Sequence, residues 1–135
     1  MLFEKSIRDG YARKVEIDSI RSKSLIKSAD DTLIAVKEFG LNEYNYNSIL
    51  RELYESLRQY CEAIGYKNGY KFLSHEVITY FIKEILKEEE ISVKFDRYRQ
   101  LRNGINYYGK SVAKETVEKA KKEIPEIIKK LKQYL

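Results

Sequence analysis

Apolar residues recur along this chain at intervals of three and four residues, which is the period of an amphipathic helix. The pattern predicts long helices over about 19–39, 48–64, 89–108 and 112–134, with shorter ones over about 2–9 and 75–87. Residues 11–17 are expected to be a connector, and residues 66–73 a loop around an Asn68-Gly69 turn. We therefore expect an all-α antiparallel up-and-down bundle of four to five helices, with residues 1–135 forming a single domain.

Residues that begin and end helices lie at the edges of these segments. Asp18, Ser74 and Ser111 precede predicted helices and are suited to accept a hydrogen bond from the first turn. Gly65 and Gly109 follow the last apolar residue of a segment and are suited to end a helix. Pro125 lies inside the last segment, where it is expected to kink or break the helix.

The segment 48–64 has a broad apolar face. This face consists of Ile49, Leu50, Leu53, Tyr54, Leu57, Tyr60, Cys61 and Ile64. We expect these side chains to form part of the core, and we place the only cysteine of the chain, Cys61, among them.

The segment 89–108 has an apolar stripe with a charge in it. Ile91, Phe95, Tyr98 and Ile105 follow the helical period, and Arg102 occupies the position where the next apolar residue is expected. A guanidinium keeps its charge in proteins, so burying it without a partner would be costly. Arg102 therefore requires a carboxylate, such as Glu55 or Glu62, or an anionic ligand.

The residues around Arg102 predict a binding site. Gly104 lies inside the same helix, where glycine is about 1 kcal/mol less favourable than alanine, and it is useful where another backbone or a ligand comes close. The candidate nucleotide- or RNA-binding residues are Arg99, Arg102, Asn103, Asn106, Tyr107, Tyr108 and Lys110. Alternative roles are a polar contact across a dimer for Asn103, and aromatic packing at the helix end for the two tyrosines.

Composition narrows the class of protein. Apolar residues make up 43% and charged residues 35%, a balance typical of a globular chain. A single cysteine excludes an internal disulfide and favours the cytoplasm. No apolar run approaches the ~20 residues of a membrane span, and the first residues lack the apolar core of a signal peptide, so no membrane partner is expected.

The positive charge is concentrated in the last third of the chain. The net charge is +5, and residues 91–135 carry twelve basic and five acidic side chains. Such a segment fits a polyanion such as RNA, and a solvated lysine-rich helix face is the alternative.

Several enzyme classes lack their signature. The chain has no glycine-rich phosphate loop of the GxxxxGK[ST] kind and no HExxH motif. One cysteine and one histidine cannot form a structural zinc site, so neither a metal nor a cofactor is expected. The only histidine, His75, is expected to be an exposed residue at the start of a helix, with a neutral ligand-binding ring as the alternative.

Four stretches together resemble the HEPN domain family of small helical bundles. They are GYARKVEID (10–18), RELYESLRQYCEAIGY (51–66), FLSHEVI (72–78) and, above all, YRQLRNGINYYGK (98–110). The resemblance covers nearly the whole chain and implies a helical bundle linked to nucleotide or RNA handling. It also implies a homodimer in which the motif helices of two chains face a shared cleft.

The chain departs from the ribonuclease motif of that family. The motif is an arginine, a polar residue, and a histidine after four to six intervening positions. Arg102 and Asn103 match its first two positions, but the histidine positions hold Tyr107, Tyr108 and Gly109. A phenol has an ordinary pKa of about 10 and is a poor base at neutral pH. The resemblance therefore implies an anion-binding cleft more than catalysis.

Three functions are consistent with these observations. The first, which we favour, is a homodimer that binds a nucleotide or RNA in a basic cleft around Arg102 without cleaving it. The second is a metal-independent, toxin-like endoribonuclease that uses Arg102 with Tyr107 or Tyr108. The third is a protein-interaction partner of a separately encoded nucleotidyltransferase, as relatives are in toxin–antitoxin pairs.

Overall fold

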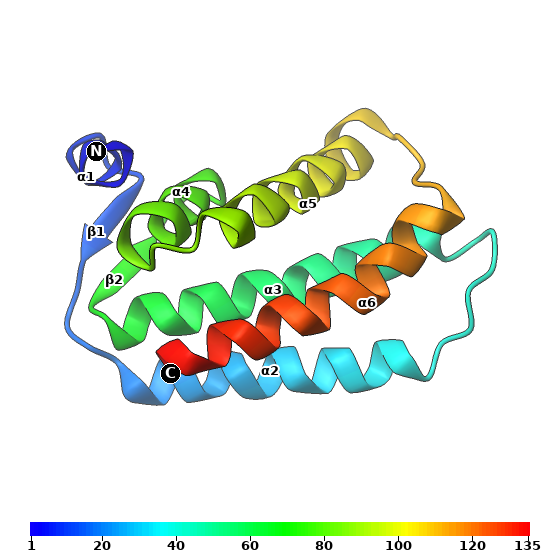
Figure 1. Ribbon diagram of the computed structural model, residues 1–135, viewed down its shortest axis with the longest axis horizontal. Helices are drawn as coiled ribbons and strands as arrows, with labels where there is room; N and C mark the ends of the chain where they lie inside the picture. Colours follow the sequence, from blue (N-terminus) through cyan, green and yellow to red (C-terminus); the bar gives the residue numbers. More distant parts are fainter.

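The computed structural model describes residues 1–135 and is mainly helical (Figure 1). Its helices are α1 (Leu2–Arg8), α2 (Ser19–Lys37), α3 (Tyr46–Lys67), α4 (Glu76–Tyr80), α5 (Glu89–Tyr108) and α6 (Lys114–Leu131). A π-helical turn over Phe81–Ile85 continues α4, and a 3-10 turn over Lys132–Tyr134 continues α6. Two short strands, β1 (Ala12–Lys14) and β2 (Tyr70–Phe72), pair with each other. The expected helical fold is thus confirmed, with six helices and a small sheet that the sequence did not predict.

Helix α3 is the centre of the molecule. It packs along α2 and also contacts α5, α6 and β2. In Figure 1, α2 and α5 run in one direction along the long axis, while α3 and α6 run in the other. The predicted apolar face of α3 is buried in full, because neighbours cover it from several sides.

Helix α5 begins and ends at the predicted residues. Ile91, Phe95, Tyr98 and Ile105 are buried, as their spacing predicts. Gly109 ends the helix with a left-handed backbone (φ 62°), a conformation that glycine adopts without the steric strain of a Cβ atom.

A hairpin replaces the predicted connector and loop. Strand β1 pairs antiparallel with β2, so that Arg13 lies opposite Lys71. The pairing extends beyond the strands, because the Leu73 N–H donates to the carbonyl of Tyr11 over 2.8 Å. Three-residue strands that lie about 55 residues apart in the chain leave no alternating pattern long enough to recognise from sequence.

Gly65 does not end α3, contrary to the prediction. The helix continues to Lys67, and Gly65 lies against the aromatic ring of Phe72 in β2. A Cβ atom at residue 65 would be 2.7 Å from Cε2 of that ring. The glycine therefore provides room for the hairpin rather than a stop signal.

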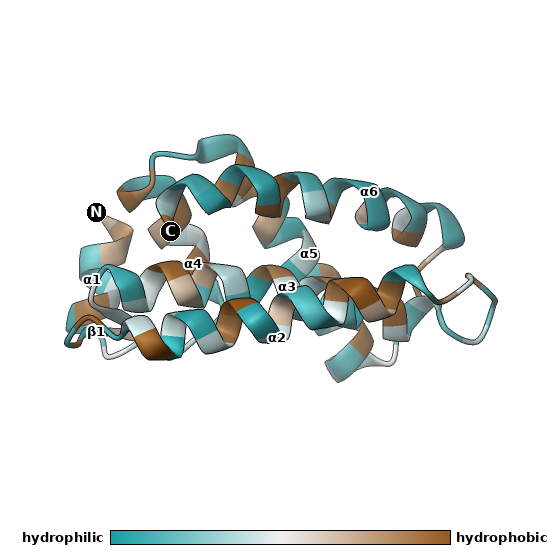
Figure 2. Ribbon diagram, turned by 90° about the horizontal axis from the view of Figure 1, so that it is seen from below, coloured by the Kyte–Doolittle hydropathy of each residue, from teal (hydrophilic) through white to brown (hydrophobic).

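Two further helix predictions were wrong in detail. Pro125 does not break α6, which continues from Lys114 to Leu131, and the helix begins after Ala113 rather than Ser111. Its buried face, which includes Ile124 and Ile128, packs on α3 and compensates for the hydrogen bond that proline cannot make. Hydrophobic and hydrophilic residues alternate along α6 in Figure 2, as expected for an amphipathic helix.

The segment predicted as one helix over 75–87 changes its geometry midway. After α4 the backbone forms a π-helical turn, whose wider spacing shifts the faces of the residues that follow. Ile85, which continues the helical spacing of the apolar residues before it, is 37% exposed as a result. None of the helices combines the length and the apolar character required to cross a membrane.

Candidate functional site

Arg102 is half-buried on α5, on the side that faces α3. Its guanidinium carbon lies 6.0 Å from the ring centroid of Tyr54 on α3 and 5.9 Å from that of Tyr107 on α5. Its Nη1 donates to Oδ1 of Asn103 over 3.3 Å. A cation near aromatic faces is stabilised modestly, and the two rings hold the guanidinium in place.

Arg102 has no carboxylate partner. Glu55 and Glu62, the two candidates from the sequence, both bind Arg58 on their own helix. The Nη1 of Arg58 lies 2.6 Å from Glu62, and its Nε donates to Glu55 over 3.0 Å. None of the ion pairs in the molecule includes Arg102. The guanidinium is therefore available to an anion from outside the chain.

A second unpaired arginine, Arg51, lies on the same face. It is exposed on α3, one helical turn before Tyr54, and its Nη1 donates to Oδ1 of Asn106 over 3.4 Å. Each of the two arginines thus contacts an asparagine of α5: Arg51 contacts Asn106, and Arg102 contacts Asn103. We refer to Arg51, Tyr54, Arg102, Asn103, Asn106 and Tyr107 as the α3–α5 face.

Arg99 lies nearby, but its charge is compensated. Its Nε donates to Oδ1 of Asp96 over 2.8 Å, and the side chain is only 16% exposed. The same carboxylate accepts hydrogen bonds from Thr79 on α4 and from Gln100. Arg99 is therefore no free cation, and it is Asp96 that joins α5 to α4 through Thr79.

Tyr108 and Lys110 lie apart from Arg102. The Nζ of Lys110 is 6.0 Å from the ring centroid of Tyr108, and the Lys110 side chain lies against Gly104. A cavity of about 260 Å³ lies beside Gly104, lined by Arg97, Gln100, Leu101 and Gly104 of α5 and by residues 110–112. Of the seven residues predicted from sequence, Arg102 and Asn106 contact side chains of α3, and Asn103 and Tyr107 contact Arg102. The side chains of Tyr108 and Lys110 lie together elsewhere, although the Lys110 carbonyl accepts a 3.2 Å hydrogen bond from Asn47 of α3.

His75 is half-buried rather than exposed, which corrects the prediction from sequence. Its Nδ1 lies 2.8 Å from the hydroxyl of Tyr54, and the two ring centroids are 5.7 Å apart. Burial, together with the positive charges of Arg58 and Arg102, lowers the pKa of His75 to about 4. The imidazole is therefore neutral at pH 7.

The sequence contained a signal for the residues that the prediction missed. Arg51, Tyr54 and Arg58 are spaced by three and four residues, so they follow one flank of α3. Tyr54 was assigned to the core alone, although a buried phenol usually directs its hydroxyl to a polar partner. No local pattern connects His75 to this flank, because the hairpin brings it there.

The positive charge of this region is smaller than its arginines suggest. Glu55 and Glu62 compensate Arg58, and Asp96 compensates Arg99, which leaves Arg51 and Arg102 as the free cations.

No group of three or more histidine, cysteine, aspartate or glutamate side chains is placed to hold a metal ion. Comparisons with protein-family models, with curated proteins and with solved structures find no match to this chain.

Proposed function

We propose that this protein is a helical binding domain that holds the phosphate of a nucleotide or RNA on the α3–α5 face without cleaving it. The observation that supports this most strongly is Arg102, a half-buried guanidinium between two tyrosine rings that no carboxylate of the chain approaches. Partial burial of a cation without a counter-ion is unfavourable, and a phosphate would relieve it. Arginine also matches the geometry of phosphate oxygens with two parallel donors.

The neighbours of Arg102 favour a nucleotide or RNA over a small inorganic anion. Tyr107 is 69% exposed beside the guanidinium, and an exposed aromatic ring stacks on bases of any sequence. Arg51 adds a second donor from α3, and it contacts Asn106 of α5. Arginines for phosphates and a phenol for a base are the groups that single-stranded RNA requires.

Binding without cleavage is proposed because the site lacks a suitable base. In the HEPN ribonuclease motif that the chain resembles, the histidine positions are Tyr107, Tyr108 and Gly109. His75, the only imidazole, has its pKa lowered to about 4 in the free protein, and its Nδ1 is engaged by the Tyr54 hydroxyl over 2.8 Å, so that nitrogen does not face a ligand as a free base.

The same proposal includes a HEPN-like arrangement of the helices and a homodimer formed through α5. Gly104 supports this, because a Cβ atom at residue 104 would meet only the flexible side chain of Lys110, at 3.5 Å. No packing within the chain accounts for the glycine, whereas a second helix at this position would. Val93, Tyr107 and Tyr108 are also more than half exposed along α5.

Fluorescence anisotropy with a labelled single-stranded RNA at low salt tests the proposal. Arg102→Ala is expected to weaken binding at least about tenfold, as loss of a charged phosphate contact does. Arg8→Ala removes the same charge from α1, at the opposite end of the molecule in Figure 1, and is expected to change the affinity less than about twofold. Equal affinities of the two variants would contradict the proposal.

The same samples distinguish binding from catalysis. RNA incubated with the protein and a chelator is expected to stay intact on a denaturing gel. Cleavage that disappears in Arg102→Ala would replace the binding proposal by a metal-independent endoribonuclease.

A further inference from the structure

Tyr54 links two groups that lie on different helices. Its ring is 6.0 Å from the guanidinium carbon of Arg102 on α5, and its hydroxyl is 2.8 Å from Nδ1 of His75 at the start of α4. One phenol therefore holds both an unpaired cation and the only imidazole of the chain. His75 belongs to the surroundings of the α3–α5 face although it comes from a third element.

The hydrogen bond to Tyr54 determines which nitrogen of His75 carries the proton. Burial raises the pKa of the Tyr54 hydroxyl, so the phenol remains a donor at neutral pH. His75 is the only hydrogen-bond partner of that hydroxyl. The charged side chains that act on it most strongly, Arg58 and Arg102, are donors only and cannot accept its proton. We therefore assign Nδ1 as the acceptor, with the proton of the neutral ring on Nε2.

The Nε2–H group is free to bind a ligand. Nε2 has no hydrogen-bond partner in the chain. The only buried side-chain nitrogen or oxygen without a partner is Oε1 of Gln59, so Nε2 is not a buried atom. It therefore reaches solvent. We propose that His75 is a further ligand of the same site, donating from Nε2 to a phosphate oxygen. When that phosphate binds, Nδ1 takes up a proton and the Tyr54 hydroxyl turns from donor to acceptor of the bond between them; this inference rests on the proposed function.

The surroundings of His75 explain why proton uptake would accompany binding. The charged groups that act on the ring are Arg58 and Glu55 from α3, and Arg102 and Arg99 from α5. Their net effect, with burial, opposes protonation in the empty site. A bound phosphate would add negative charge beside these arginines. An opposite charge within hydrogen-bond distance favours the charged form of a group, so the phosphate is expected to raise the pKa of His75 by about 1 to 3 units.

NMR of the single histidine tests this inference on the intact protein. The Cε1–H signal of His75 is titrated between pH 4 and 8, alone, with AMP, and with an oligoadenylate that lacks terminal phosphates. The midpoint is expected near 4 for the free protein, and at least about one unit higher with ligand. A shift with AMP alone would identify a phosphate monoester as the ligand, whereas a shift with both would extend the site to the diesters of RNA.

The affinity supplies a second readout. A midpoint of about 6 in the complex makes oligoadenylate bind about twofold tighter at pH 6 than at pH 8, and a midpoint of about 7 makes it bind about tenfold tighter. His75→Gln keeps a donor near the position of Nε2 but cannot take up a proton. This variant is expected to bind at pH 8 like the wild type, without the gain at pH 6.

The outcomes separate this inference from the proposed function. Ligand binding that depends on Arg102 but leaves the His75 midpoint unmoved would overturn the role of His75 and leave the proposed function intact. Absence of binding to both ligands would overturn the proposed function and the inference with it. A pH dependence that persists in His75→Gln would also count against His75.

Discussion

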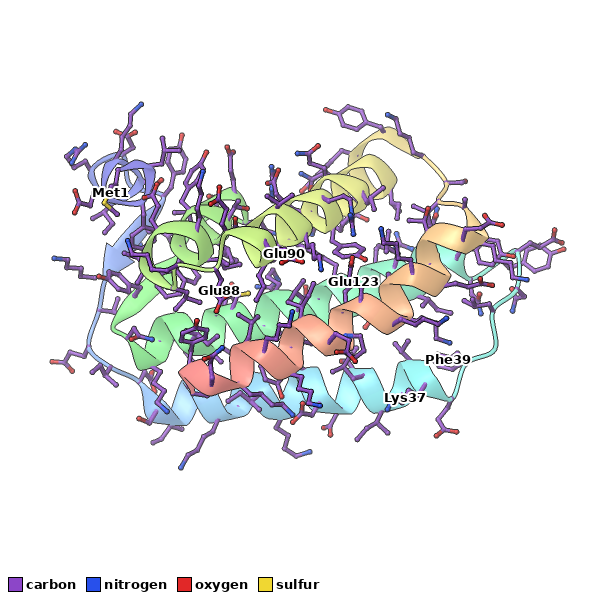
Figure 3. The ribbon with its side chains drawn as sticks, viewed as in Figure 1. Met1, Lys37, Phe39, Glu88, Glu90 and Glu123 are labelled. Carbon is purple, nitrogen blue, oxygen red and sulfur yellow. The ribbon has the colours of Figure 1, made fainter.

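The hydroxyl of Tyr98 on α5 donates a 2.6 Å hydrogen bond to Oε1 of Glu123 on α6. The same carboxylate pairs with Arg97 and lies 3.6 Å from the Nζ of Lys94. Figure 3 shows Glu123 between the ribbons of α5 and α6. One carboxylate thus holds three residues of the site helix, and it fixes α5 to α6.

We predict that Glu123→Gln lowers the free energy of unfolding by about 1.5–3 kcal/mol at pH 7, because charged hydrogen bonds contribute about this much. Urea denaturation measures the change. Glu126→Gln, an exposed position on the same helix, is the control and is expected to be nearly neutral. Equal stabilities of the two variants would remove Glu123 from this role.

The stabilisation by Glu123 depends on pH. Burial alone would raise the pKa of Glu123, but the Tyr98 hydrogen bond and the charges of Arg97 and Lys94 lower it below the ordinary 4.5. Its contribution is therefore complete above pH 4.5 and is lost as the pH falls through the lowered value. The wild type and Glu123→Gln are expected to converge in stability toward pH 3.

Gly65→Ala is predicted to destabilise the protein by about 1–3 kcal/mol. The new Cβ would lie 2.7 Å from the ring of Phe72 and 3.2 Å from the carbonyl oxygen of Tyr70, so the hairpin would have to move. Gly40→Ala is the matched control, since no atom lies within 4 Å of its Cβ position. Thermal unfolding of both variants decides the point, and a harmless Gly65→Ala would show that the hairpin is not packed as described.

Substitutions at Gly104 separate folding from association. Gly104→Ala is expected to stabilise the monomer by up to about 1 kcal/mol, because alanine is the better helix former and meets only Lys110. Gly104→Glu is expected to fold but to disrupt the proposed dimer by placing a charge in the contact. Analytical ultracentrifugation measures the second effect, and an unchanged oligomeric state would contradict a dimer formed through α5.

Cys61 provides a probe of global unfolding. It is buried in α3, and burial raises the pKa of its thiol. Ellman's reagent is expected to react with it only as fast as the protein unfolds, and at once in denaturant. Fast labelling of the native protein would show that the core around α3 opens locally.

The helices were predictable from sequence because their apolar stripes are long. The eight core residues of α3 and the four of α5 are buried as the spacing predicts, and α5 has the predicted bounds. The hairpin was not predictable from sequence, since three-residue strands carry almost no periodic signal. Gly65 was misjudged for a related reason: only its contact with Phe72 shows why a helix interior needs a glycine.

The site was predictable where it lies within one helix and not where it spans several. Arg102 stood out as a charge in an apolar stripe, and Asn103, Asn106 and Tyr107 followed by proximity. Sequence spacing says nothing about which carboxylate reaches an arginine across helices. The sequence therefore left open whether Glu55 or Glu62 neutralises Arg102. In the structure both carboxylates pair with Arg58 instead.

A crystal structure of the protein with bound AMP tests the central claim most directly. We predict that the phosphate lies within hydrogen-bond distance of the Arg102 guanidinium on the α3–α5 face. A phosphate bound instead by the lysines of α6, with Arg102 left in contact with solvent, would contradict the account.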